Sequence, residues 1–233
     1  GVFPHRDLVS CTNMSINSTS NLALLAGRRC FAIVDLASPA SLVLREARQS
    51  KWEVVCSEWS VQEERLLAVA SNNKVELITC RDTELVVDAV LRSHTRAVTD
   101  LAWHTHDRQL LATSSADNYI YLWDMRDLRR PSAGLQAVQG AAKVEWNKVS
   151  GKYLASTHDG EVKLWDIRKS NVPVQYINAH LSRIYSLDWS WDHEDSLATS
   201  SQDNTVHFWN VAAPAKAENT IKTSGAPVWQ LQH

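Results

Sequence analysis

Two stretches of the chain carry the residue types of a serine or threonine hydrolase. The first contains His94, Thr113 or Ser115, Asp117 and Trp123. The second, with the same His-to-Trp spacing, contains His180, Thr199 or Ser201, Asp203 and Trp209. A histidine held between a hydroxyl and a carboxylate can activate the hydroxyl as a nucleophile. The chemistry that these residues could support is therefore acyl transfer through a Ser or Thr oxygen.

The repetition of this set favours a structural interpretation. A reactive centre needs an exposed nucleophile and an oxyanion hole, whereas a buried polar chain needs only that each member has a partner. We therefore predict an internal network that runs from the Trp N–H through a hydroxyl and the His to the Asp. A third copy keeps Asp159 and Trp165 but has Gln139-Gly140 near the place of the His. A serine hydrolase acting through Ser115 or Ser201 is the enzymatic alternative.

These residues lie in a motif that recurs along the chain. The segments 119–124, 161–166 and 205–210 align with one another through Trp123, Trp165 and Trp209, and two degenerate copies occupy 30–35 and 74–79. A period of roughly 40–45 residues with Trp-Asp endings is the signature of a four-stranded propeller blade. The chain thus resembles the WD-repeat family over nearly its whole length.

A second series of tryptophans and a set of turn pairs support this assignment. Trp59, Trp103, Trp146 and Trp189 each precede the end of a copy by a similar number of residues, and stretches such as 98–103 alternate as a half-buried strand does. Two-residue pairs that tolerate positive φ separate the following apolar runs. These pairs are Asn72-Asn73, Asp117-Asn118, Asp159-Gly160 and Asp203-Asn204.

The predicted fold is therefore an all-β WD-repeat β-propeller. The predicted blades cover 9–46, 52–92, 95–137, 139–177 and 181–222, and 226–233 begins a further blade. Because WD propellers usually have seven blades, the resemblance implies about five blades plus the start of a sixth. Since a propeller sheet ring must close, we expect further residues after His233 or another chain over the open edge. Residues 1–8 are expected to form an outer strand of the last blade, and the missing initiator Met indicates a fragment or a processed chain.

Composition excludes several other classes of protein. The net charge is −2, with 44% hydrophobic and 21% charged residues, and no basic stripe indicates nucleic-acid binding. No run of apolar residues is long enough for a membrane-spanning helix, and the first residues do not form a secretory signal. The four cysteines form no Cys-x-x-Cys pair, so reduced thiols are preferred over two disulfides. We predict no cofactor and no metal, because His104, His106 and Asp107 fit a solvated loop better than a metal site.

The resemblance also suggests where partners bind. In WD repeats the rim of the propeller carries the residues after the His turn and before the turn Asp, which here are Arg96, Arg183, His158 and Gln202. Arginine is enriched at interface hot spots, so Arg96 and Arg183 are the stronger candidates. Trp191 and Trp229 are further candidate interface residues.

Several segments resemble, more narrowly, the WD-repeat subunits of the second GATOR subcomplex. They are 113–121, 156–162, 179–189, 198–204 and 227–229, with weaker similarity at 27–29 and 49–52. The resemblance implies a non-catalytic scaffold that binds other protein subunits and relays amino-acid sufficiency to the TOR kinase. It also implies a cytoplasmic protein recruited to the lysosomal surface. It implies neither nucleic-acid binding, membrane insertion nor a small-molecule substrate. The alternative is a substrate receptor of a cullin–RING ubiquitin ligase, docking through the Trp-Asp-x-Arg motifs that end at Arg126 and Arg168.

Overall fold

The structure is a computed structural model that describes residues 11–39, 42–169 and 171–231. In these ranges the chain forms strands joined by turns and loops, and no α-helix occurs. None of these residues therefore belongs to a helix long and apolar enough to cross a bilayer.

Twenty strands form five four-stranded sheets. The first sheet contains β1 (Cys11–Ile16), β2 (Leu22–Gly27), β3 (Cys30–Asp35) and β4 (Leu42–Ala47). The second contains β5 (Cys56–Trp59), β6 (Leu66–Ser71), β7 (Lys74–Cys80) and β8 (Leu85–Leu91). The third contains β9 (Val98–Trp103), β10 (Leu110–Ser115), β11 (Tyr119–Asp124) and β12 (Ala133–Gln136). The fourth contains β13 (Lys143–Trp146), β14 (Tyr153–His158), β15 (Glu161–Asp166) and β16 (Gln175–Asn178). The fifth contains β17 (Ile184–Trp189), β18 (Ser196–Ser201), β19 (Thr205–Asn210) and β20 (Asn219–Lys222).

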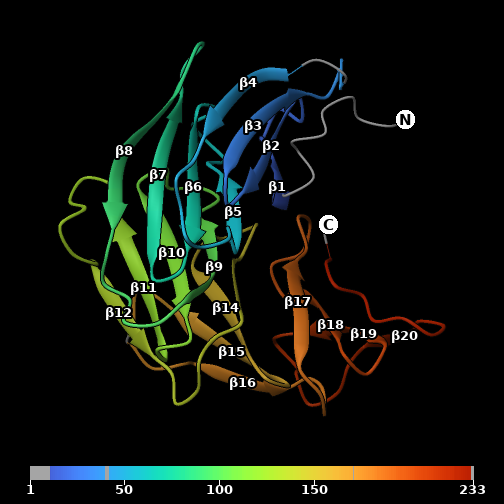
Figure 1. Ribbon diagram of the computed structural model, residues 1–233. Helices are drawn as coiled ribbons and strands as arrows, with labels where there is room; N and C mark the ends of the chain where they lie inside the picture. Colours follow the sequence, from blue (N-terminus) through green and yellow to red (C-terminus); the bar gives the residue numbers. More distant parts are fainter. Residues whose placement is uncertain (1–10, 40–41, 170, 232–233) are drawn as a thin grey trace.

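The sheets follow one another around an arc (Figure 1). Within each sheet the strands pair antiparallel in chain order, and the first strand of each sheet contacts the first strand of the next. Figure 1 shows the arc open between β1 and β17. This arrangement is that of propeller blades around a common axis, so the predicted all-β propeller is confirmed.

The hydrophobic core lies between the blades. It consists of four clusters, and each draws its residues from two neighbouring sheets. Between the first and second blades, for example, Leu24 and Ile33 pack with Trp59, Leu67 and Ile78. A single four-stranded sheet has apolar side chains on both faces here, so no blade can bury its surface without a neighbour.

The second tryptophan series links each blade to the one before it. The indole N–H of Trp59 donates to the Ser15 carbonyl at 3.2 Å. The same bond recurs around the arc in Trp103 to Glu58 O at 3.2 Å, Trp146 to Ala102 O at 3.0 Å and Trp189 to Glu145 O at 3.2 Å. Each of these indoles is buried, so its single donor is satisfied without water. The regular spacing of this series in the sequence therefore reflects one repeated contact between inner strands.

The turns between the second and third strands have the backbone expected of their residues. Asn72, Asn118, Asp159 and Asn204 have φ angles of 53°, 70°, 51° and 63°. Asn and Asp tolerate this left-handed region better than other side-chain-bearing residues. The tight hairpins predicted at these four places are therefore confirmed.

The final described segment lies beside the fifth blade without forming a strand. The Trp229 ring stacks on Tyr185 of β17 with centroids 4.3 Å apart, and the Leu231 N–H donates to Ser186 Oγ at 3.0 Å. Residues 223–231 contain no strand, so the start of a further blade at 226–233 remains a prediction. The outer strand predicted for residues 1–8 lies outside the described residues.

Candidate functional site

The third blade contains the complete predicted network. The indole of Trp123 donates to Thr113 Oγ1 at 2.9 Å, and His94 Nε2 lies 2.9 Å from the same oxygen. On its other side His94 Nδ1 lies 3.0 Å from Asp117 Oδ2, which also accepts the Thr95 N–H at 2.8 Å. Since the Trp donates to the hydroxyl, the hydroxyl donates to the His, and the neutral Nδ1–H tautomer completes the chain.

Burial sets the protonation of this network. It lowers the pKa of His94, because the charged imidazolium loses its hydration, and Asp117 offsets this only in part. Burial opposes ionisation of Asp117, but hydrogen bonds from Thr95 and His94 hold its pKa below the usual value. A neutral His beside a carboxylate that is itself occupied by backbone donors stabilises the turn.

The fifth blade repeats the arrangement. Trp209 donates to Thr199 Oγ1 at 3.0 Å, and His180 Nε2 lies 2.9 Å from that oxygen. His180 Nδ1 lies 3.1 Å from Asp203 Oδ2, and its ring stacks on His207 with centroids 4.2 Å apart. The structure thus selects Thr113 and Thr199 as the network hydroxyls.

Ser115 and Ser201 have a different role. Ser115 Oγ donates to the Ala97 carbonyl at 2.9 Å, and Ser201 Oγ to the Arg183 carbonyl at 3.0 Å. Both side chains are fully buried. A hydroxyl bound to a main-chain carbonyl and closed off from solvent has no histidine to activate it and no route for a substrate.

In the fourth blade, the structure corrects the prediction for His158. This side chain is 1% exposed and belongs to the network, so it is not available to a partner. Trp165 donates to Ser156 Oγ at 2.8 Å, and that oxygen lies 2.8 Å from His158 Nε2. His158 lies at the end of β14, whereas the histidines of the third and fifth blades lie in the loop before the first strand. Its ring nevertheless reaches the hydroxyl to which the Trp indole donates.

Gln139, in the loop before β13, connects His158 to the turn residue Asp159. His158 Nδ1 lies 2.7 Å from the Gln139 carbonyl, and the Gln139 side chain donates to Asp159. Burial lowers the pKa of His158 to about 4. Sequence comparison of the blades missed this network because the histidine occupies a different register position, although the order Ser156-x-His158 was visible.

The remaining rim candidates are exposed. Arg96, Arg183 and Gln202 lie in the loops and turns at one end of the third and fifth blades, and their side chains face solvent. The one contact of the Arg96 side chain is a long hydrogen bond of 3.5 Å to the Ala116 carbonyl. These positions are accessible, and their role in partner binding stays a prediction.

Arg126 and Arg168, the residues of the alternative ubiquitin-ligase hypothesis, are bound within their own repeats. Arg126 Nε donates to Asp124 Oδ1 at 2.8 Å. Arg168 Nη2 donates at 2.8 Å to Asp166, whose side chain is fully buried. This hydrogen bond and the backbone N–H of Arg168 lower the pKa of Asp166 to about 2. Each arginine therefore has a structural function that requires no partner protein.

Two exposed tryptophans rest on neighbouring side chains. Trp229, 66% exposed, stacks on Tyr185, and Trp191, 50% exposed, lies under the Lys148 ammonium at 4.8 Å. One face of each indole is therefore covered by a neighbouring side chain.

Sequence reasoning missed a set of charged residues on the inner strands. The carboxylate of Glu58 in β5 accepts the backbone N–H of Trp103 at 2.9 Å. Asp100 of β9 accepts the Val144 N–H at 3.1 Å and the Lys143 ammonium at 3.2 Å. Polar contacts between consecutive blades thus accompany the indole bonds. A signal was present, because the pairs Glu58-Trp59, Glu145-Trp146 and Asp188-Trp189 repeat an acidic residue before the indole.

The inner carboxylates are hard to ionise. Burial and then the nearby Glu145 raise the pKa of Glu58 well above its usual value. Burial and then Asp188 raise the pKa of Glu145 to about 8. Protonated carboxyl groups at neutral pH reduce the repulsion that four inner acidic side chains would otherwise cause.

The histidines of the loop after β9 are bound within the protein. Among the described residues no group of three His, Cys, Asp or Glu side chains could hold a metal ion. His104 is buried; its Nε2 lies 2.8 Å from the Gly151 carbonyl, and its Nδ1 accepts the His106 and Asp107 N–H groups. Both ring nitrogens are therefore occupied. The four cysteines are free thiols.

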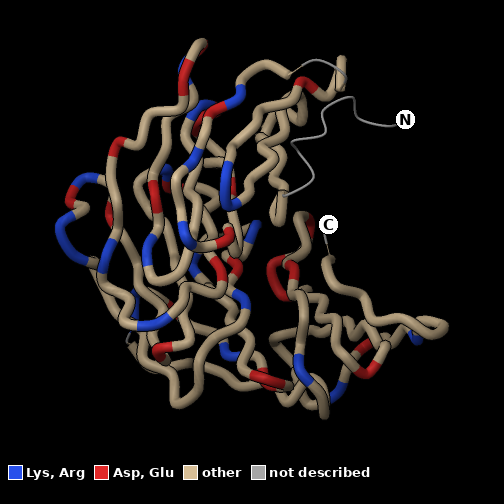
Figure 2. The backbone as a smooth tube through the Cα atoms, viewed as in Figure 1, with Lys and Arg blue, Asp and Glu red and all other residues tan. Residues whose placement is uncertain are grey.

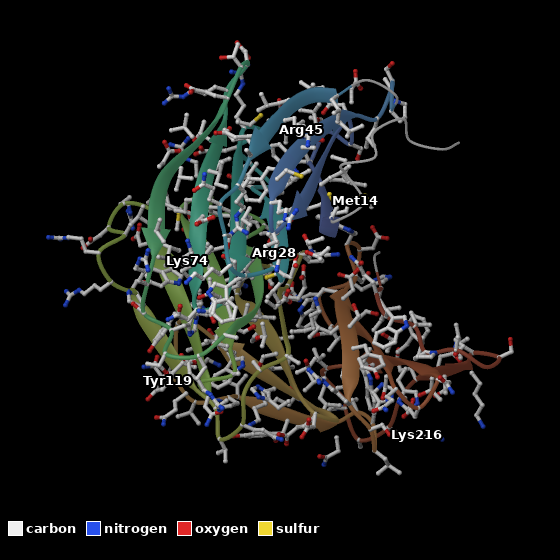
Figure 3. The ribbon with its side chains drawn as sticks, in the orientation of Figure 1. Met14, Arg28, Arg45, Lys74, Tyr119 and Lys216 are labelled. Carbon is white, nitrogen blue, oxygen red and sulfur yellow. The ribbon has the colours of Figure 1, made fainter. Side chains whose placement is uncertain are left out.

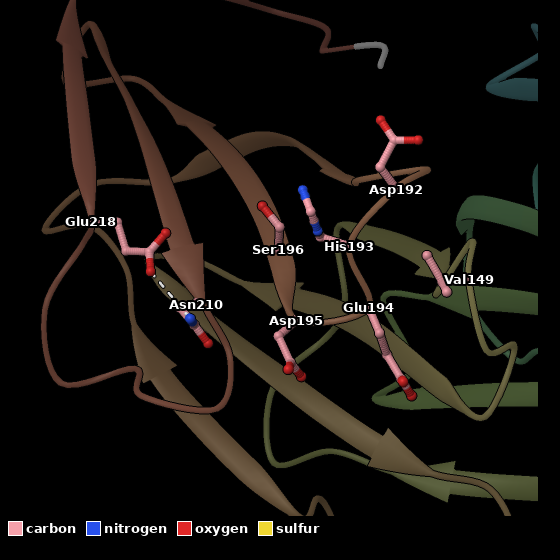
Figure 4. Close-up of a pocket in the computed structure, with 8 residues that line it drawn as sticks. All are labelled: Val149, Asp192, His193, Glu194, Asp195, Ser196, Asn210 and Glu218. Atoms are coloured by element: carbon pink, nitrogen blue, oxygen red, sulfur yellow. Dashed lines mark hydrogen bonds between the residues drawn. The ribbon is translucent and has the colours of Figure 1, made fainter.

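A hollow of about 510 Å³ in the fifth blade is rich in acidic residues. Figure 4 shows that Asp192 and Glu194 point in opposite directions along its rim, while Glu218 turns toward Asn210. The Asn210 amide donates to Glu218 at 3.1 Å. Because the carboxylates diverge, this hollow presents no common point at which one ligand could be held.

Comparison with known proteins agrees with this geometry. The family model described as "WD domain, G-beta repeat" matches residues 86–124 and 171–210. The chain is 42% identical to the human GATOR2 complex protein WDR59 over 95% of its own length and 23% of the relative. It is 39% identical to Drosophila melanogaster GATOR2 complex protein Wdr59 over 99% of its own length and 24% of that protein. The chain therefore spans about a quarter of the length of these relatives.

A solved structure supports the fold alone. A chain in a crystal structure of the mitotic checkpoint complex superposes with a TM-score of 0.80 at 22% identity, over 94% of this chain and 65% of that chain. The repeated Trp-terminated sheets, the matched family model and the similarity to WDR59 converge, and the chain belongs to the WD-repeat family.

Proposed function

We propose that this chain is a non-catalytic scaffold that assembles with other protein subunits in a GATOR2-type complex. The observation that carries the proposal is the 42% identity to the human GATOR2 protein WDR59 across 95% of the chain. Such a complex would relay amino-acid sufficiency to the TOR kinase from the cytoplasm, at the lysosomal surface. The partners are proteins, with no nucleic acid, membrane insertion or small-molecule substrate in this role.

The geometry supports a scaffold over an enzyme. The two Thr hydroxyls that contact histidines are fully buried, and each already accepts an indole N–H. Ser115 and Ser201 contact main-chain carbonyls instead of histidines. An active-site serine probe is therefore expected to leave both serines unlabelled, and labelling of either would return the hydrolase hypothesis.

Affinity purification tests the scaffold proposal. The full-length protein, tagged and expressed in its own cells, is expected to recover GATOR-type subunits identified by mass spectrometry. Recovery of a cullin–RING adaptor in their place, lost in Arg168→Ala, would support the ubiquitin-ligase alternative. The Arg168–Asp166 contact explains this arginine without such an adaptor, so we expect the variant to keep its partners.

A further inference from the structure

The first blade departs from the other blades at its second turn. Where the later blades carry Asn72-Asn73, Asp117-Asn118, Asp159-Gly160 and Asp203-Asn204, the first carries Arg28-Arg29. Neither arginine has positive φ, and both side chains are exposed. The fold closes the same turn elsewhere with neutral or acidic residues, so the two positive charges are not a requirement of the architecture.

These arginines line a shallow hollow of about 520 Å³. Its six lining residues are Arg28, Arg29, Arg48, Gln49, Ser50 and Lys51. Four of the six are cationic and none is acidic. Figure 3 labels Arg28 in the first blade and Lys74 in the second, and the Lys74 ammonium pairs with Glu76.

Arg48 forms the fixed floor of this hollow. Its side chain is 7% exposed, donates to Ser71 Oγ at 2.8 Å and to the Trp52 carbonyl at 3.2 Å, and lies 3.4 Å from Glu76. Its guanidinium also lies over the Phe31 ring at 5.2 Å from the centroid. The loop that carries Lys51 is therefore held in place by a buried arginine.

The same loop presents an aromatic side chain. Trp52 is 54% exposed, although its backbone N–H donates to Ser50 Oγ at 3.1 Å and its carbonyl accepts a hydrogen bond from Arg48. A large indole on a fixed backbone loses little entropy when a partner covers it, and Trp is enriched at hot spots. The rim therefore combines an apolar anchor with cations.

Half of the positive charge in the hollow is uncompensated within the described part of the chain. Glu53 lies 3.8 Å from Arg28, and Glu76 is shared by Arg48 and Lys74. Arg29 and Lys51 have no ion-pair partner among the described residues. These two cations are free to pair with carboxylates from another molecule, for which the arginine fork is well suited.

We propose that this hollow, together with the adjacent Trp52 on the same loop, binds an acidic peptide segment of a partner protein. The carboxylates of the segment pair with Arg29 and Lys51, and an apolar side chain of the segment packs on the Trp52 indole. The proposal rests on the scaffold function and names a surface and a partner chemistry for it.

The distribution of charge favours a peptide over nucleic acid. Figure 2 shows acidic and basic residues interspersed along the described chain, without a continuous basic stripe. A nucleic-acid backbone is tracked by such a stripe, whereas a single basic hollow beside one aromatic matches a short acidic segment.

A binding assay with purified full-length protein tests the proposal. The probe is a fluorescein-labelled peptide of Asp and Glu residues around one Phe, followed by anisotropy at low and moderate salt. The double variant R29E/K51E is expected to weaken binding by about tenfold or more. Trp52→Ala is expected to weaken the Phe peptide more than a peptide with Gly in its place.

A matched control keeps the change in net charge constant. R129E/R130E reverses two arginines that lie in the loop before β12, outside the hollow, and is expected to bind as the unmodified protein does. Equal binding by R29E/K51E, or equal loss in the control, would overturn the proposal. So would preferential binding to phosphatidylserine vesicles or to a single-stranded oligonucleotide.

The two proposals fail separately. Recovery of the complex in affinity purification with no peptide binding would refute only this surface. Peptide binding that depends on Arg29 and Lys51, with no GATOR-type subunits recovered, would refute only the scaffold assignment.

Discussion

The first two blades and the last three hold the same four-stranded sheet together in different ways. In the third and fifth blades a threonine at the centre of the second strand joins a tryptophan to a histidine, and in the fourth a serine does so. The equivalent residues of the first two blades are Leu25 and Val69, with Val34 and Ile78 in place of the tryptophan. The sheet geometry is therefore compatible with either a buried polar chain or simple apolar packing.

This difference has a consequence for the turns. A blade with a network needs an acceptor at its turn, which Asp117 and Asp203 provide. A blade without a network leaves the turn free to vary, and the first blade carries Arg28-Arg29 there. Loss of the internal network thus coincides with the basic surface that we propose as a docking site.

The largest expected effect concerns Gly160, in the turn between β14 and β15 of the fourth blade, which packs against the loop that leads into the fifth blade. A Cβ at Gly160 would lie 2.1 Å from the His180 carbonyl oxygen, which is backbone and cannot move freely. Gly160→Ala is expected to destabilise the protein by about 3 kcal/mol, measured by thermal unfolding with tryptophan fluorescence. Gly134→Ala is the control, since its nearest atom is the Tyr121 ring at 3.2 Å. If the two variants were equally stable, the close approach of the His180 carbonyl would not be what restricts position 160 to glycine.

A reciprocal pair of substitutions tests the comparison directly. Thr113→Val leaves the Trp123 N–H and the His94 ring without a partner, and we expect a loss of about 2 kcal/mol. Val69→Thr places an unpartnered hydroxyl in the apolar second blade, with an expected loss of about 1–2 kcal/mol. Stability is measured by urea unfolding. If either substitution left the free energy of unfolding unchanged, the polar network and the apolar packing would be interchangeable. The distinction between the blades would then have no energetic basis.

Acid is expected to weaken the last three blades before the first two. The folded-state pKa of His158, about 4, lies below the ordinary histidine value. The unfolded chain therefore binds a proton that the folded chain does not, and stability falls as pH falls from about 6.5 toward 4 by about 1 kcal/mol per unit. Burial lowers the pKa of His94 and His180 in the same direction. Hydrogen exchange is measured at pH 7 and pH 5. At pH 5 the opening of residues 98–222 should accelerate more than that of the first two blades, and uniform acceleration across all blades would contradict the expectation.

At the inner strands the dependence of stability on pH has the opposite sign. The pKa of Glu145, about 8, lies above the ordinary value, so its ionisation destabilises the folded state as pH rises from about 4.5 to 8. Glu145→Gln removes this cost, and we expect a gain in stability that grows as the pH rises from 5.5 to 8.5. Thermal unfolding at both pH values measures it. A gain of equal size at the two values would exclude titration of this group as the cause.

The fold could be predicted from the sequence because two independent signals recur together in the last three blades. The Trp-terminated strands and the earlier tryptophans keep their spacing, and the Asn and Asp turn residues report the backbone directly. Periodicity of this kind identifies every strand that has one buried face.

The site could be predicted only where it follows the repeat. His94 and His180 occupy equivalent positions and were identified as network members, whereas His158 reaches the same place from another strand and was mistaken for a rim residue. Thr113 and Ser115 are two residues apart and share one face in the alternation of a strand, so spacing alone left the choice between them open. The basic hollow depends on a loop, residues 48–52, whose path no periodic signal determines.

The indole bonds between inner strands give the propeller a direction. In every case the donor lies in the later blade and the acceptor carbonyl in the earlier one. Because a chain is synthesised from its amino end, the acceptor carbonyl of each bond is made before the indole that donates to it. The polarity of one repeated contact thus matches the direction of synthesis.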